Sequence, residues 1–150
     1  MPRFFRRLAE GVFDEDDLRL RTDELADFVE KASPAAGMPA GSAVAIGFSN
    51  GANIASSLLL RHPETLAGAV LIAAMVPYTG GPGPTDLTGK KVLVVNGTRD
   101  PIVPVTQTDA LVAQLRAAGA EVTEHRHSGS HTVPTSALPP IAAFLRGFEG

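Results

Sequence analysis

Residues 42–61 read SAVAIGFSNGANIASSLLLR, and the pattern changes at Ser49. The residues before it, 42–48, form a short apolar run of the kind that fills a buried β-strand. The run after it, 50–61, has the length of a helix and stops at His62 and Pro63, because the residue before a proline disfavours helical backbone. The stretch therefore predicts a strand, a tight turn and a helix, in that order.

The turn carries a recognisable pattern. Residues 47–51 are Gly-Phe-Ser-Asn-Gly, a match to G-x-S-x-G, in which a nucleophilic serine occupies a sharp turn between a strand and a helix. Glycines two positions away let the strand and the helix pass closely. The positive end of the following helix also faces the place where negative charge would develop. We therefore interpret Ser49 as a candidate nucleophile.

A serine nucleophile needs a base that takes its proton and an acid that orients the base. Asp100 follows the apolar run 92–95 through a short turn, and His131 lies in a Gly-Ser-His loop beyond an alternating run that ends at residue 127. Each interval between the three residues holds about one strand–helix unit, so all three are expected at the same carboxyl edge of a parallel sheet. We expect Asp100 to be the acid and His131 the base.

Other acids and histidines compete for these two roles. Asp86 lies in a loop rich in glycine and proline, and Asp109 lies within a predicted helix, which are poorer places for an orienting acid. His125 and His127 alternate on a predicted strand, so they share one face and are expected to be solvated or packed. No third ligand converges with this histidine pair in the sequence, and we expect no metal site there.

The remaining sequence alternates in the same way. Beyond the strand over 42–48, strands are expected over 66–74, 90–96 and 120–127, and beyond the helix over 50–61, helices over 14–31, 106–118 and 134–148. In the last helix, Leu138, Ile141, Leu145 and Phe148 are expected to face inward. About four strands alternating with helices predict an α/β fold with a parallel sheet and right-handed crossovers. Residues 1–150 are expected to form a single domain.

The composition of the chain excludes several kinds of function. The net charge of −3 gives no electrostatic footprint for nucleic acid, and the chain has no cysteine, which excludes disulfides and a cysteine nucleophile. No stretch approaches the ~20 apolar residues of a membrane span, and the start lacks the apolar core of a signal peptide, so we expect a cytoplasmic protein. The acidic run 14–17 lacks the spacing of a calcium loop and is interpreted as the start of a helix.

Three blocks resemble the α/β-hydrolases of the phospholipase/carboxylesterase group, small esterases similar to acyl-protein thioesterases. The blocks are residues 47–53, 96–104 and 129–131. The resemblance implies that Ser49 is the nucleophile, Asp100 the orienting acid and His131 the general base, with the backbone N–H of Asn50 as one oxyanion-hole donor. It further implies hydrolysis of small-molecule carboxylic esters or thioesters through an acyl-enzyme, a reaction that needs no metal or organic cofactor.

Met75, Val76 and Pro77 follow the second predicted strand at the active edge of the sheet. We expect them to bind substrate by lining the acyl pocket. The alternative is that they only pack beneath the loop that continues to residue 89.

The N-terminal segment departs from the family pattern. Members of this group carry a strand ending in His-Gly before the nucleophile, but the sequence has no His-Gly dipeptide. Before Ser42 it shows an arginine-rich stretch and one helix, with no strand-like run. We therefore expect the hydrolase fold to be N-terminally truncated, with Met1 an internal methionine. Loss of an oxyanion donor lowers turnover by ~10²–10³, and the strand before Ser49 would become a sheet edge.

Two other functions remain open at this point. One is a catalytically weak or inactive hydrolase domain that acts as a dimerising or binding module, and a homodimer could cover the exposed edge. The other is a different reaction on the same residues, either acyl transfer to an acceptor other than water or ring opening of the dienelactone type. A cysteine nucleophile would point to the latter, whereas serine favours plain esters.

Overall fold

Parallel strands alternate with helices in the computed structural model, which describes residues 7–9, 12–81 and 83–148. The elements are β1 (Arg7–Ala9), β2 (Val12–Phe13), α1 (Glu15–Ala35), β3 (Ala43–Phe48), α2 (Asn50–Arg61), β4 (Leu66–Ile72), β5 (Lys91–Gly97), α3 (Val105–Ala117), β6 (Glu121–His127) and α4 (Leu138–Arg146), with short 3₁₀ turns at Pro63–Thr65 and Thr135–Ala137. Met1, expected to be an internal methionine, lies outside the described residues.

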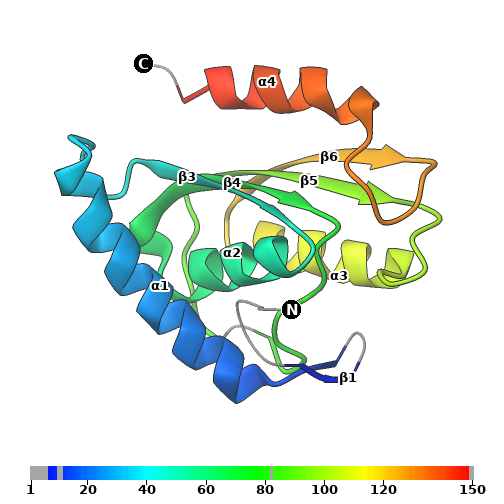
Figure 1. The fold of residues 1–150 in the computed structure, drawn as a ribbon, viewed down its shortest axis with the longest axis horizontal. Coiled ribbons are helices and arrows are strands. Elements are labelled where there is room, and N and C mark those ends of the chain that lie inside the picture. The colour runs from blue at the N-terminus through cyan, green and yellow to red at the C-terminus, as the bar shows by residue number, and fades with distance from the viewer. Residues whose placement is uncertain (1–6, 10–11, 82, 149–150) are drawn as a thin grey trace.

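The central sheet has the order β3-β4-β5-β6, and every neighbouring pair is parallel. Helices α2 and α3 cover one face and α4 covers the other, while α1 packs along α2 (Figure 1). This arrangement confirms the predicted α/β-hydrolase-like parallel sheet. The helix after Ser49 has the predicted bounds, and the strand expected over 66–74 ends two residues early, at Ile72.

The two central strands send alternate side chains into two hydrophobic cores. Leu71 and Val94 belong to the core beneath α2 and α3, whereas Val70 and Leu93 belong to the core beneath α4. A parallel sheet buried on both faces needs such continuous apolar strands. The sheet is therefore fixed in register by packing on both sides, and the ends of its strands are well defined.

Other features also differ from the sequence-based expectations, and α1 continues to Ala35 where the helix was expected to end at residue 31. The segment before Ser42, where no strand was expected, contains a short antiparallel pair, β1 with β2. The sequence does not predict this pair, because strands of two or three residues are too short to show an alternating pattern. The helix expected over 134–148 begins later, at Leu138, after a 3₁₀ turn. Leu138 is 57% exposed instead of buried: it is the first residue of α4, and only Ile141 and Leu145, further along the same face, pack against the core beneath the helix.

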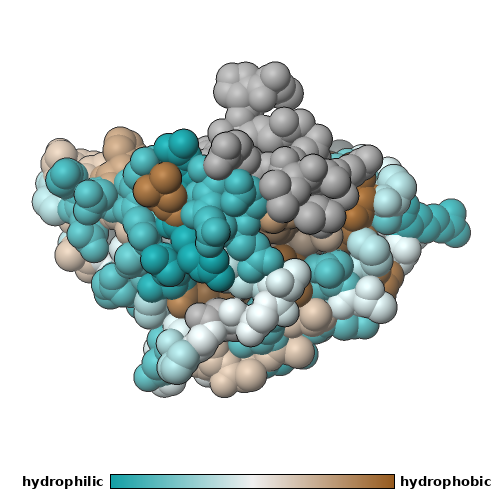
Figure 2. Space-filling model, turned by 90° about the horizontal axis from the view of Figure 1, so that it is seen from below, coloured by the Kyte–Doolittle hydropathy of each residue, from teal (hydrophilic) through white to brown (hydrophobic). Residues whose placement is uncertain are grey.

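Strand β3 forms one edge of the sheet, as expected. It pairs with β4 and with no other strand among the described residues. Ile46 is 56% exposed and Phe48 is 41% exposed, and an apolar groove of about 260 Å³ runs beside them between β3, α1 and α2. Seen from below, by contrast, the side of the molecule where α1 lies is mostly hydrophilic (Figure 2).

Within the described residues no helix is long and apolar enough to cross a membrane.

One carboxylate ties α1 to the end of α2. Asp23 accepts hydrogen bonds from Arg61, at 2.6 and 3.0 Å, and lies 2.6 Å from Nε2 of His62. The hydrogen bond from Arg61 is the main reason that the pKa of Asp23 falls to about 2, from an ordinary value of 3.8. Because the carboxylate is the bonded form, this contact stabilises the fold while Asp23 is ionised.

Asp23→Asn should lower the free energy of unfolding at pH 7 by about 0.5–1 kcal/mol, a small amount because the Asp23 side chain is 44% exposed. The depressed pKa means that the contribution is present above about pH 4 and is lost as the pH falls towards 2. Urea unfolding at pH 7 and at pH 2.5 measures the difference, with the exposed Asp27→Asn as the control. If the difference in unfolding free energy between Asp23→Asn and the unmodified protein is as large at pH 2.5 as at pH 7, this account is contradicted.

Candidate active site

Ser49 lies in a strained turn between β3 and α2. Its backbone angles are φ 56° and ψ −116°, a conformation that residues with a side chain rarely adopt. Two hydrogen bonds hold the turn: the N–H of Ser49 donates to the carbonyl of Ile72 at 2.8 Å, and its carbonyl accepts from Asn53 at 2.9 Å. The turn points the serine hydroxyl away from the sheet and towards His131.

The glycine pattern around Ser49 has a direct steric cause. A Cβ atom placed on Gly47 would lie 2.5 Å from the carbonyl carbon and oxygen of Gly51 and 2.6 Å from the backbone nitrogen of Ala52. These atoms belong to the first turn of α2, and backbone packed in this way cannot move aside easily. Gly47 is therefore required for the close passage of strand and helix that the sequence pattern predicts.

Ser49, His131 and Asp100 form one continuous chain of hydrogen bonds. Nε2 of His131 lies 2.8 Å from Oγ of Ser49, and Nδ1 lies 2.7 Å from Oδ2 of Asp100. The second carboxylate oxygen, Oδ1, accepts from the backbone N–H groups of Ile102 at 2.7 Å and Val103 at 3.0 Å. The Asp100 side chain is only 1% exposed. One oxygen of the Asp100 carboxylate is thus held by backbone N–H groups, and the other bonds the imidazole of His131.

The competing acids and histidines make other contacts in the described structure, and His127 bonds the backbone of the loop that carries His131 without bonding Ser49. Asp86 accepts hydrogen bonds from Thr88 in its own loop, and Asp109 pairs with Arg126. His125 stacks on His127, with ring centroids 6.4 Å apart. Among the described residues no group of three histidine, cysteine or acidic side chains could hold a metal ion.

The loop that carries His131 rests on the end of β5. A Cβ atom on Gly97 would lie 2.4 Å from the carbonyl oxygen of Gly129 and 2.6 Å from that of Ser130. The N–H of Arg99 donates to the same Gly129 carbonyl at 3.1 Å. Close backbone approach at Gly97 therefore places the histidine loop beside the turn that carries Asp100.

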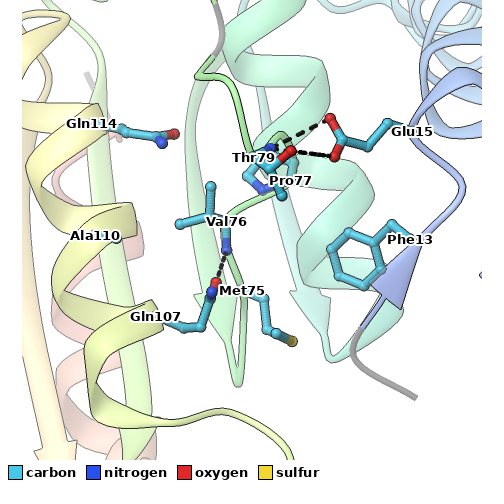
Figure 3. A pocket seen from close by; sticks show the side chains of 9 residues that line it. All are labelled: Phe13, Glu15, Met75, Val76, Pro77, Thr79, Gln107, Ala110 and Gln114. Carbon is cyan, nitrogen blue, oxygen red and sulfur yellow. Dashed lines mark hydrogen bonds between the residues drawn. The ribbon is translucent and has the colours of Figure 1, made fainter. Parts of the chain in front are cut away.

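A small cavity of about 60 Å³ is lined by Ser49 and His131, and a larger pocket of about 310 Å³ adjoins it. Phe13 and Met75 line both spaces. Val76 and Pro77 line the larger pocket together with Met75, so all three predicted substrate-binding residues border it (Figure 3). The geometry therefore offers a space beside Ser49 in which part of a substrate could lie.

Polar side chains hold the loop that forms one wall of this pocket. Its backbone N–H groups are bonded as follows: Ala74 to Asn96 Oδ1 at 3.4 Å, Met75 to Asn53 Oδ1 at 2.8 Å, Val76 to Gln107 Oε1 at 3.0 Å, and Thr79 to the carboxylate of Glu15 at 3.3 Å. The acceptors come from β5, α2, α3 and α1 respectively. Sequence reasoning assigned none of them a role, although Asn53 and Asn96 lie within blocks that carry the family resemblance.

This geometry agrees with the comparison with known proteins. The sequence model of the Phospholipase/Carboxylesterase family matches residues 7–148, nearly the whole chain. The chain belongs to this family. Among curated proteins, "Putative hydrolase MhqD" of Bacillus subtilis strain 168 is 44% identical over 131 residues, which are 87% of this chain and 65% of the relative. The chain thus spans just under two thirds of that relative's length.

Solved structures of two carboxylesterases show the same fold. The Bacillus cereus carboxylesterase matches with a TM-score of 0.93 and 42% identity over 99% of this chain and 69% of that one. The carboxylesterase of Mesorhizobium loti matches with a TM-score of 0.89 and 30% identity, over 97% of this chain and 68% of the other. The chain is therefore a member of a carboxylesterase-type hydrolase family and has the α/β-hydrolase fold of that family.

Gly47→Ala should destabilise the protein by about 3 kcal/mol or prevent folding, because the added methyl group meets the backbone of α2. Gly80→Ala is the matched control: nothing lies within 4 Å of a Cβ there, and its effect should stay within about 0.5 kcal/mol. Urea unfolding of the two variants measures the difference. Equal stabilities would show that the turn does not require glycine.

Proposed function

We propose that the protein hydrolyses carboxylic esters or thioesters through an acyl-enzyme formed on Ser49. The observation that supports this most strongly is the unbroken chain from Asp100 through His131 to Ser49, with distances of 2.7 and 2.8 Å. These are the distances at which a histidine can accept a serine proton while a carboxylate holds its ring.

In the first half of the reaction, Nε2 of His131 takes the proton of Ser49 as Oγ attacks the substrate carbonyl carbon. The Nδ1–H of the ring donates to Asp100, which stabilises the imidazolium without taking its proton. The tetrahedral intermediate collapses, the bond to the leaving oxygen or sulfur breaks, and His131 donates the proton to that atom. The alcohol or thiol departs and the acyl group stays on Ser49 as an ester.

In the second half, His131 removes a proton from water and the resulting hydroxide attacks the acyl-enzyme carbonyl. Collapse returns the proton to Oγ of Ser49 and releases the carboxylic acid. The oxyanion of both intermediates would be stabilised by the N–H of Asn50. Asn50 is the first residue of α2, and an N–H in the first helical turn has no partner within its helix.

The acyl group would lie in the pocket of about 310 Å³ that adjoins the small cavity lined by Ser49. Met75 borders both the reactive cavity and this pocket, and Val76 and Pro77 extend the apolar wall. Tethering of Met75 and Val76 by Asn53 and Gln107 keeps that wall in place. The alternative of a purely binding or dimerising module is less well supported, because such a module would not need an assembled serine, histidine and aspartate chain.

Hydrolysis of p-nitrophenyl butyrate tests the proposal. Asp100→Asn should lower kcat by roughly 10³–10⁴-fold, because the amide no longer holds the required tautomer of His131. Asp109→Asn, which removes an exposed carboxylate on α3, is the control and should keep full activity. Ester hydrolysis that survives both Ser49→Ala and Asp100→Asn would rule out this mechanism.

A further inference from the structure

One wall of the larger pocket carries two glutamine side chains, which the acyl-pocket prediction does not explain. Gln107, Ala110 and Gln114 line it from α3 (Figure 3). Residues spaced by three and by seven positions lie on one face of a helix, so the two glutamines stand one above the other with a small alanine between them. The rest of the lining consists of apolar side chains and two polar ones, namely Phe13, Met75, Val76 and Pro77 with Glu15 and Thr79.

The amide of Gln107 is oriented by the loop across the pocket. Its Oε1 accepts the backbone N–H of Val76 at 3.0 Å, so the oxygen must face the loop. The NH₂ group of the same amide therefore keeps its two donors, because a primary amide carries two N–H groups besides its carbonyl. Gln107 thus fixes the wall formed by Val76 and offers a donor at its own side of the pocket.

Gln114 presents a buried acceptor. Its Oε1 is inaccessible to solvent and has no hydrogen-bond partner among the described residues. A buried polar atom without a partner is unfavourable by an amount comparable to a lost hydrogen bond. In Figure 3 the side chain extends from α3 towards the loop that carries Val76 and Thr79. A rotation of the Gln114 amide towards the pocket would let a ligand group donate to this oxygen and would remove the penalty.

The charges around the pocket favour a neutral ligand. Glu15 is the one ionisable side chain in the described lining, and it already accepts hydrogen bonds from Thr79, at 2.8 Å to the hydroxyl. Arg19 lies 3.9 Å from the same carboxylate. The negative charge opposes an anionic ligand, while the two glutamine amides supply a donor and an acceptor for an uncharged one.

We propose that Gln107 and Gln114 make the pocket selective for acyl groups that carry a neutral amide or hydroxyl group, over plain alkyl chains of the same length. This inference rests on the proposed esterase function. A volume of about 310 Å³ holds about ten water-sized groups, which is enough for a short functionalised acyl chain. The amide of such a chain would donate to Gln114 and accept from Gln107.

Two p-nitrophenyl esters with the same six-atom acyl chain provide the test. One is the hexanoate, and the other is the N-acetyl-β-alanyl ester, in which an amide replaces the fourth and fifth carbons. The selectivity is the ratio of kcat/KM for the amide ester to that for the hexanoate. Gln114→Leu should lower this ratio at least about tenfold relative to the unmodified protein, because a site built to hydrogen-bond a substrate discriminates by such factors.

The matched control is Thr106→Val, which replaces an exposed polar side chain of α3 outside the pocket and should leave the ratio unchanged. Gln114→Met, which keeps an unbranched side chain, replaces Gln114→Leu if the leucine variant does not fold. A ratio that stays within twofold in the folded Gln114 variant overturns the proposal.

Binding separates this inference from the proposed function. Ser49→Ala cannot form an acyl-enzyme, and calorimetric titration with the methyl esters of N-acetyl-β-alanine and hexanoic acid measures pocket preference without turnover. Tighter binding of the amide ester, lost when Gln114→Leu is added, supports the pocket assignment even if the unmodified protein hydrolyses neither ester. Equal binding of the two esters overturns it, whatever the esterase activity.

Discussion

The positive φ of Ser49 is the constraint on which the site depends. A serine at φ 56° holds that conformation only if its surroundings fix it from both sides. Here β4 fixes one side, because the N–H of Ser49 donates to the carbonyl of Ile72, and α2 fixes the other through its contact with Gly47 and its buried Leu58 and Leu59. The chemistry proposed for Ser49 therefore depends on the hydrophobic core as well as on its immediate partners.

The partners of Ser49 reach it because the sheet is parallel. Asp100 follows β5 and His131 follows β6, so both leave the same edge as Ser49, which follows β3. Backbone contacts fix the loops that carry these residues. Gly97 packs closely against the carbonyl of Gly129, and the two N–H groups that follow Asp100 donate to its carboxylate. In the same way, three side-chain amides hold the backbone of residues 74–76 at the neighbouring pocket.

The sequence predicts the parallel sheet and the helix over 50–61 because these rest on local hydrophobic pattern and on proline. It also predicts that Ser49, Asp100 and His131 lie together, since chain order and strand ends place them at one edge; their catalytic roles remain predictions. It could not predict the tethers from Asn53, Asn96 and Gln107, because no periodicity marks an amide that bonds distant backbone. β1 and β2 were missed because their pairing is too short to leave a pattern.

Labelling with a fluorophosphonate, followed by intact-mass analysis, tests the central claim that the fold activates Ser49. We predict one stoichiometric adduct on the folded protein, located on the peptide that contains Ser49. The adduct should be absent from Ser49→Ala and retained in Ser128→Ala, which removes an exposed hydroxyl near His131. No adduct on the folded protein, or an adduct that persists in Ser49→Ala, would contradict the account.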